Sequence, residues 1–278
     1  MTDATRAATS YVDVPGARLA YDTAGAGPAL LLVHAGVTDR RMWDDVMPAL
    51  AENRRVVRYD TRGYGETRQL EDVAYSNRAD AIAVLDGLGI DRATIVGVSR
   101  AGSIAVDTAI EFPGRVSAVV HVAGGLGGFE APTTPEEEAA FEEAERLEEA
   151  RDWPALVESE LRLWIDGLGQ SPERVPAVRE RVRPMLVDLH RDHADEPLDQ
   201  VIVLEPRAVG RLAELTAPVL VIVGDLDTPE TQAAGRHLAA NAPNARLETM
   251  TGVAHLPPME RPADFVRILE AFLDANGA

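Results

Sequence analysis

The chain has 278 residues, which is enough for one large α/β domain with an insertion, and its formal net charge at pH 7 is −19. Proteins that bind a nucleic-acid backbone carry clustered positive charge, so this acidic balance argues against a nucleic-acid partner. The sequence contains neither cysteine nor lysine, which excludes disulfides, thiolate nucleophiles and Schiff-base chemistry.

The first eleven residues lack the basic segment followed by an apolar stretch that marks a secretory signal. The sequence also lacks any run of about 18 uninterrupted apolar residues. We therefore expect a soluble, cytoplasmic protein without a membrane partner.

Residues 1–128 alternate between strand and helix patterns. Ala29–Val33 is an uninterrupted apolar run, which is typical of a parallel strand buried on both faces. Strands are predicted at Tyr11–Val14, Arg18–Asp22, Ala29–Val33, Arg55–Tyr59, Thr94–Val96 and Val116–Val122. Helices are predicted at Arg40–Ala51, Arg78–Leu88 and Ser103–Glu111. The alternation predicts right-handed βαβ units and a mostly parallel, twisted sheet with helices on both faces.

Residues 129–206 show helical patterns without strands. A capping box at residues 134–137 starts an acidic helix, and a second helix is predicted from near Trp153. A third is predicted over Glu173–Leu189, with a bend at Pro184. We interpret this block as a helical cap, or lid, that covers one edge of the sheet.

The α/β pattern returns after the cap. Strands are predicted at Val219–Val223 and Arg246–Met250, and helices at Pro229–Asn241 and Pro262–Leu273. The predicted organisation is therefore an α/β core made of residues 1–128 and 207–278, with residues 129–206 as the cap.

The segment Gly97-x-Ser99-x-Ala101-Gly102 lies between a predicted strand and a predicted helix. A serine in a tight strand-to-helix turn is strained and closely packed, so it needs small residues two positions away on each side. Gly97 and Ala101 meet this need, and Gly102 lets the helix lie close to the sheet. The pattern predicts an exposed hydroxyl at a helix N-terminus, where backbone N–H groups favour negative charge.

Three residues have the types and the order of a catalytic triad. Serine is a weak nucleophile unless a base takes its proton, and the base needs a third group that fixes its tautomer. Ser99, Asp227 and His255 each follow a predicted strand, and the carboxyl ends of parallel strands meet at one edge of a sheet. Serine, then acid, then histidine is the expected chain order on such a sheet. Asp225 is a rival acid in the same turn.

The other histidines fit this chemistry less well. His34 and His121 end predicted strands and are interpreted as structural. His190, His193 and His237 fall in helical or exposed contexts without a serine or carboxylate motif nearby. No cluster with metal-ligand spacing occurs in the sequence, so neither a metal ion nor another cofactor is predicted.

Five ordered motifs resemble those of a known family. They are His34-Ala35-Gly36, Asp60-x-Arg62-Gly63-x-Gly65, Gly97-x-Ser99-x-Ala101-Gly102, Gly224-x-x-Asp227 and Gly252-x-x-His255. With them the chain resembles the α/β-hydrolase superfamily, in particular its lactonase and esterase branch, which includes 3-oxoadipate enol-lactonases. The resemblance implies the α/β-hydrolase fold with a variable helical cap. The Gly-x-x-Asp spacing of the family also favours Asp227 over Asp225 as the acid of the triad. Some relatives place this acid after the strand that ends near Ala123, and the nearest carboxylate there is Glu130.

Acyl transfer places negative charge on the former carbonyl oxygen, which two N–H donors must face. Arg100 supplies one backbone N–H because it follows the nucleophile, and Gly36 is predicted to supply the other. The chain departs from commoner relatives at Ala35, where glycine is usual, and at Arg100, where an uncharged side chain is frequent. We expect the Arg100 side chain either to bind an anionic group of the substrate or to pair with a carboxylate elsewhere.

We predict that Ser99 attacks the carbonyl of a small apolar ester or lactone, with His255 as base and Asp227 orienting it. A pocket between cap and core is expected to be lined by Val37, Trp43, Phe129, Trp153, Trp164 and Met185. The same triad also serves carbon–carbon bond hydrolases and perhydrolases, and a non-catalytic ligand receptor on this fold is a further alternative. The serine nucleophile argues against haloalkane dehalogenases and epoxide hydrolases, which use aspartate there.

Overall fold

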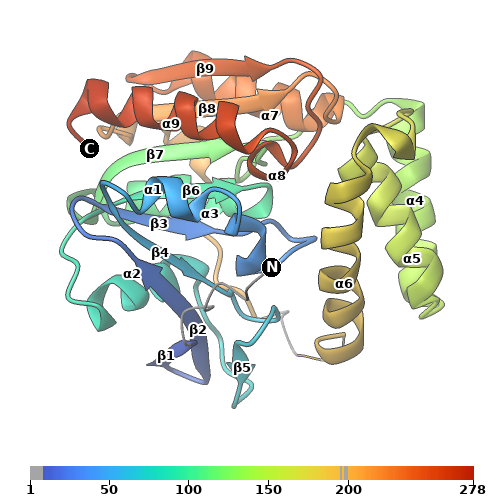
Figure 1. The fold of residues 1–278 in the computed structure, drawn as a ribbon, viewed down its shortest axis with the longest axis horizontal. Coiled ribbons are helices and arrows are strands. Elements are labelled where there is room, and N and C mark those ends of the chain that lie inside the picture. Colours follow the sequence, from blue (N-terminus) through green and yellow to red (C-terminus); the bar gives the residue numbers. More distant parts are fainter. Residues whose placement is uncertain (1–8, 195, 197–199) are drawn as a thin grey trace.

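The computed structural model describes residues 9–194, 196 and 200–278, and a mixed β-sheet runs through it (Figure 1). The strands lie in the order β1-β2-β4-β3-β6-β7-β8-β9, and β5 pairs with β2. Their bounds are β1 (Ser10–Val14), β2 (Ala17–Ala24), β3 (Ala29–Val33), β4 (Arg55–Tyr59), β5 (Arg68–Gln69), β6 (Ala93–Val98), β7 (Val116–Val122), β8 (Val219–Gly224) and β9 (Ala245–Met250). From β4 to β9 along this order neighbouring strands are parallel, whereas β2 is antiparallel to β1, β4 and β5.

The central strands are apolar because both of their faces are covered. Every residue of β6 and β8 is buried, as is nearly all of β3. The pairing register aligns Val33 at the end of β3 with Gly97 near the end of β6. Likewise Val122 at the end of β7 pairs with Ile222 of β8. The loops that follow β3, β6 and β8 therefore leave the sheet at the same edge.

Helices cover both faces of this sheet. The helices of the described residues are α1 (Met47–Leu50), α2 (Asn77–Gly87), α3 (Arg100–Glu111), α4 (Pro135–Glu149), α5 (Trp153–Glu160), α6 (Pro176–Asp192), α7 (Pro229–Asn241), α8 (Pro257–Glu260) and α9 (Pro262–Asn276), of which α4, α5 and α6 lie apart from the sheet faces. Buried side chains of α2, α3 and α7 share one apolar cluster with the sheet, and those of α1 and α9 share the other. Within the described residues, no helix combines the length and the apolar composition of a transmembrane span.

The helices between β7 and β8 form a separate group, which we call the cap. Figure 1 shows α4, α5 and α6 beyond the carboxyl ends of β3 and β9. A π-helical segment at Leu161–Asp166 continues α5, and this segment was not predicted. The capping box of Thr134 and Glu137 is present at the start of α4. The α6 helix passes through Pro184 and begins at Pro176, three residues later than predicted.

The prediction of one continuous helix over residues 40–51 is wrong. Arg40–Trp43 forms a 3₁₀ turn, and α1 begins separately at Met47. Pro48 explains the break, because proline has no N–H to donate to the carbonyl four residues before it and its ring crowds that turn. The α3 helix, in contrast, begins at Arg100, earlier than the predicted start.

Candidate active site

Ser99 occupies the turn between β6 and α3. Its backbone angles are φ 58° and ψ −124°, which non-glycine residues adopt only under strain. Two hydrogen bonds hold this conformation: Ser99 N donates to Val122 O at 2.9 Å, and Gly102 N donates to Ser99 O at 2.8 Å. The half-buried serine therefore stands at the N-terminus of α3, in the kind of turn that the sequence predicted.

The glycines around Ser99 allow the strand, the turn and the helix to touch. A Cβ on Gly97 would lie 2.0 Å from Ala101 O, and a Cβ on Gly102 would lie 3.0 Å from the Cα of Gly124. Backbone atoms cannot move aside as a flexible side chain can. Small residues at these two positions are therefore required by the packing of β6, α3 and the loop after β7.

His255 and Asp227 meet as a buried pair. His255 Nδ1 donates to the Asp227 carboxylate, with distances of 2.9 Å to Oδ1 and 3.0 Å to Oδ2. The side chains are 3% and 1% exposed. Because Nδ1 carries the proton, Nε2 is left as the acceptor that a general base needs. Asp225, the rival acid, is exposed and accepts a hydrogen bond from Gly252 N at 2.6 Å.

Ser99 and His255 are not hydrogen-bonded to each other in the described structure. Contacts between a nucleophile and its base are often long without substrate and tighten in the reacting complex. The structure brings Asp227 and His255 into contact, and it places Ser99 after β6, two strands from β8 in the sheet and at the same edge.

The loop after β3 holds Gly36, the residue predicted to donate to the oxyanion. Since Val33 pairs with Gly97, this loop and the Ser99 turn start from neighbouring positions of adjacent strands. A turn closed by Thr38 N and Ala35 O, 3.2 Å apart, fixes the path of the loop. The N–H of Arg100 lies in the first turn of α3. The pairing of Gly36 N and Arg100 N as oxyanion donors stays a prediction.

His34 and His121 have structural partners. His34 Nδ1 donates to Ala35 O at 2.8 Å and Nε2 accepts from Thr61 N at 3.1 Å, which ties the loops after β3 and β4 together. Burial, reinforced by the Arg100 charge, lowers the pKa of His34 to about 4. Burial also lowers the pKa of His121, whose Nε2 donates to Gly125 O at 2.9 Å. Both rings are therefore held neutral.

The Arg100 side chain contacts a hydroxyl group and an aromatic ring. Its Nη2 donates to Thr61 Oγ1 at 2.6 Å, and its guanidinium lies over the Tyr64 ring at 4.8 Å from the centroid. Among the described residues, no ion pair between Arg100 and a carboxylate is seen. The positive charge stays next to the loop that carries Gly36, because Tyr64 Oη would lie 3.6 Å from a Cβ on Gly36.

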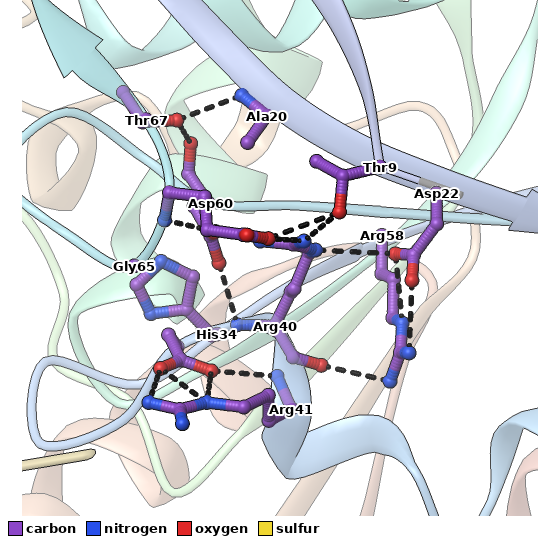
Figure 2. Close-up of polar contacts among 12 residues, drawn as sticks. Thr9, Ala20, Asp22, His34, Arg40, Arg41, Arg58, Asp60, Gly65 and Thr67 are labelled. Atoms are coloured by element: carbon purple, nitrogen blue, oxygen red, sulfur yellow. Dashed lines mark hydrogen bonds and ion pairs between the residues drawn. The ribbon is translucent and has the colours of Figure 1, made fainter. Parts of the chain in front are cut away.

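Asp60, which opens one of the family-like motifs, organises a buried polar network (Figure 2). Its carboxylate accepts from Arg40 N at 2.8 Å and from Glu66 N at 2.9 Å, and it also binds the Arg40 guanidinium. Gly65 is needed here, because it has φ 56° and its Cβ would lie 2.2 Å from an Asp60 oxygen. Asp22 approaches the Arg40 Nε at 3.4 Å. The motif therefore fixes the loop after β4 against the 3₁₀ turn.

The cap reaches the candidate site through Trp164 of the π-helical segment. The Trp164 ring lies 4.5 Å from the His255 ring, centroid to centroid, at an interplanar angle of 39°. Phe141 of α4 also packs against the Trp164 ring, with the two ring centroids 5.9 Å apart. Val37 and Met185 are buried in the same apolar cluster, to which Trp164 is packed. Trp164 therefore lies where the cap contacts His255, and the placement of Val37 and Met185 in a substrate pocket stays a prediction.

The other three predicted pocket residues have different aromatic neighbours. Trp43 is fully buried, packs against Phe265 of α9 and belongs to the same apolar cluster as Val37 and Met185. Phe129 packs against His237 of α7, with ring centroids 4.6 Å apart. Trp153 stacks on His190 and lines a cavity of about 690 Å³ that is bounded by cap residues only. The periodicity of an amphipathic helix does not distinguish these environments.

Comparison with known proteins gives consistent matches. A sequence model described as the alpha/beta hydrolase family matches residues 30–268. The chain is 32% identical over 301 residues to the 2-hydroxy-6-oxononadienedioate/2-hydroxy-6-oxononatrienedioate hydrolase of Burkholderia vietnamiensis, covering 98% of this chain and 99% of that protein. It is 38% identical over 125 residues to the 2-hydroxymuconate semialdehyde hydrolase of Pseudomonas sp., a match that spans only 44% of that relative.

Among solved structures, the enol-lactonase from Burkholderia xenovorans LB400 superimposes with a TM-score of 0.77 at 26% identity. The superposition covers 95% of this chain and 100% of the lactonase. The sheet order, the strained serine turn and the extent of the family match agree with one another. This chain belongs to the alpha/beta hydrolase family.

Proposed function

We propose that the protein is a serine hydrolase that cleaves a small apolar carboxylic ester or lactone through an acyl-enzyme. Ser99 is the nucleophile, His255 the general base and then acid, and Asp227 the group that orients the imidazole. The observation that carries the proposal is the buried His255–Asp227 hydrogen bond at the sheet edge where Ser99 sits in its strained turn.

In the first half of the reaction His255 Nε2 takes the proton of Ser99 Oγ while Oγ attacks the substrate carbonyl carbon. The carbonyl electron pair moves to oxygen, and the N–H groups of Gly36 and Arg100 stabilise that charge. The tetrahedral intermediate collapses, the carbon–oxygen bond to the leaving group breaks, and His255 returns its proton to the leaving oxygen. An ester releases an alcohol here, whereas the alcohol of a lactone stays attached to the acyl group.

In the second half a water molecule attacks the acyl-enzyme. His255 takes the proton of this water, and the second tetrahedral intermediate breaks the bond to Ser99 Oγ. His255 then protonates Oγ, which restores the free serine and releases the carboxylic acid. Asp227 stays ionised throughout and stabilises the imidazolium that forms in each half.

Substitution of Ser99 by alanine tests the proposal. We expect Ser99→Ala to lower kcat for p-nitrophenyl acetate by about 10⁴-fold or more, since the covalent route is then lost. It should also abolish labelling by a fluorophosphonate. Ser103→Ala, one turn further along α3, is the matched control and should keep both properties. Unchanged hydrolysis in Ser99→Ala would contradict the proposal, and tight ligand binding without turnover by the wild type would favour the receptor alternative.

Carbon–carbon bond hydrolysis is a second candidate. It is favoured by one observation, the 32% identity along nearly the whole chain to the Burkholderia vietnamiensis hydrolase named above. A comparison of kcat/KM for a 2-hydroxy-6-oxodienoic acid and for p-nitrophenyl esters decides between the two chemistries. We expect the ester to give the higher value, and a dienoic acid that is turned over at least tenfold faster would reverse the assignment.

A further inference from the structure

Glu260 of α8 brackets the loop that carries His255. We call residues 251–256 the histidine loop. The Glu260 carboxylate accepts from Ala254 N, at 3.1 Å to Oε1 and 3.0 Å to Oε2, and from Leu256 N at 3.1 Å. These are the backbone N–H groups immediately before and after His255. The Glu260 side chain is 1% exposed, so both donors depend on it inside the protein.

Arg174, which lies in the cap between the π-helical segment and α6, binds this same carboxylate. Its Nη1 pairs with Glu260 and also donates to Gly252 O of the histidine loop at 3.1 Å. Its Nε donates to Asp166 O at 2.8 Å, and its Nη2 donates to Ile165 O at 2.7 Å. One guanidinium therefore satisfies two carbonyls at the end of the π-helical segment and two oxygens on the histidine side.

Two further contacts place the same end of the π-helical segment against the candidate catalytic loops. The Trp164 ring lies on the His255 ring, with centroids 4.5 Å apart. Gly167, directly after the segment, has φ 91°, and a Cβ there would lie 2.9 Å from Leu226 O and 3.2 Å from the Ala254 Cβ. The cap thus lies close to Leu226 and Ala254, the residues that precede Asp227 and His255, as well as to the imidazole itself.

We propose that Arg174 and Glu260 are a positioning pair, which fixes His255 and makes its orientation depend on the docked cap. The inference rests on the proposed function, because it takes His255 as the base. Glu260 holds the backbone on both sides of His255, Asp227 holds Nδ1, and Trp164 covers the ring face. The arginine fork reaches the cap carbonyls and the Glu260 carboxylate together, so it links cap docking to the angle at which His255 Nε2 meets Ser99 Oγ.

Arg174→Met tests the pair, with Arg179→Met as the matched control. Arg179 lies in the same part of the cap and also binds two acidic groups, Asp166 and Glu158, and it shows neither a hydrogen bond nor an ion pair to the histidine loop. We expect Arg174→Met to lower kcat for p-nitrophenyl acetate by about 10²-fold, the loss that a displacement of about 1 Å can cause. KM should change by less than about threefold, because binding is not the step that is affected. Arg179→Met should keep kcat within about threefold.

The low-field proton signal of His255 Nδ1–H in the free protein supplies a readout that is independent of turnover. We expect it to broaden or disappear in Arg174→Met and to persist in Arg179→Met, with His255→Gln identifying the signal. Glu260→Gln keeps an oxygen for the two N–H groups and removes the charge that Arg174 binds, so it should move kcat and the signal in the same direction. It also replaces Arg174→Met in the test if that variant does not fold.

The outcomes separate this inference from the proposed function. If esters are hydrolysed but Arg174→Met and Arg179→Met match in kcat and in the proton signal, the positioning pair is refuted and the proposed function stands. If the wild type hydrolyses no ester but the proton signal is lost only in Arg174→Met and Glu260→Gln, the proposed function fails and the positioning of His255 is supported. Loss of activity that follows the melting temperature equally in both arginine variants would also refute the pair.

Discussion

At the residue scale, partners rather than residue type separate the histidines of this protein. His255 donates Nδ1–H to a carboxylate and keeps its other nitrogen for chemistry, whereas His34 donates to a carbonyl and uses its other nitrogen to accept a backbone N–H. A ring with both nitrogens engaged by the backbone fixes loops and cannot accept a further proton without losing a hydrogen bond. Burial of this neutral form explains the low pKa of His34.

His34 is expected to contribute to acid sensitivity. Its pKa is about 4 in the folded protein and 6.5 for an unperturbed side chain, so the unfolded chain binds more protons between these values. Stability from this residue is complete above pH 6.5 and falls by up to about 1.4 kcal/mol per pH unit as the pH drops towards 4. His34→Gln can replace both hydrogen bonds and should show a flatter decline, measured by urea unfolding at several pH values. A slope equal to that of the wild type would contradict the prediction.

At the element scale, the candidate site depends on how closely β6, α3 and the loop after β7 approach one another. The pairing of β3 with β6 sets the loop of Gly36 next to the Ser99 turn on one side, and the hydrogen bond from Ser99 N to Val122 O holds the end of β7 against this turn on the other side. The strain at Ser99 is maintained because neighbouring backbone segments leave no room for the turn to relax. Packing of whole elements therefore determines the direction of one hydroxyl.

A methyl group at Gly97 should disrupt this packing. Gly97→Ala would place Cβ 2.0 Å from Ala101 O, a clash with backbone that only a shift of the turn can relieve. We expect a loss of about 3 kcal/mol in the free energy of unfolding and a fall in esterase kcat, because overpacking a rigid site is costly. Gly114→Ala is the control, since a Cβ there meets nothing within 4 Å. Denaturant unfolding and ester hydrolysis measure both effects, and similar behaviour of the two variants would refute this explanation.

At the scale of the whole molecule, the cap shares an apolar cluster with the core. Buried residues of α6, such as Val182 and Leu186, belong to the same cluster as Trp43 and the buried side chains of α9. Ion pairs cross the same boundary, for example Arg41 with Asp188 at 3.0 Å. A cap that contributes to the main core does not have a separate interior, so its unfolding is coupled to that of the sheet.

Val182→Ala tests this coupling. The fully buried side chain loses two methyl groups, and we expect a fall of about 2 kcal/mol in the free energy of unfolding through one cooperative transition. Val187→Ala on the same helix, at a site 44% exposed, should change it by less than about 0.5 kcal/mol. Far-UV circular dichroism and tryptophan fluorescence should give the same midpoint. A separate transition for the cap in Val182→Ala would contradict the prediction.

The sequence by itself determined the α/β class, nearly all central strands and the serine turn. These features follow from local patterns: apolar runs make buried strands, and small residues around Ser99 permit the turn. The sequence also predicted that Asp227 and His255 lie at one edge of the sheet, because each follows a strand and parallel strands end at the same edge regardless of their side chains. Pro48 could have indicated the break between the 3₁₀ turn and α1, but the prediction of one continuous helix followed the apolar spacing and disregarded the proline.

Only the tertiary structure decided which side chains meet across the sheet edge. The Trp164 ring lies near the His255 ring, whereas Trp153 stacks on His190 and Trp43 packs against Phe265, although all three tryptophans were predicted to line one pocket. Arg174 and Glu260 are 86 residues apart, and no local signal joins them. Such contacts depend on where the cap is placed on the core, and that placement comes from the sum of many apolar and ionic contacts between distant segments, which periodicity within one segment does not encode.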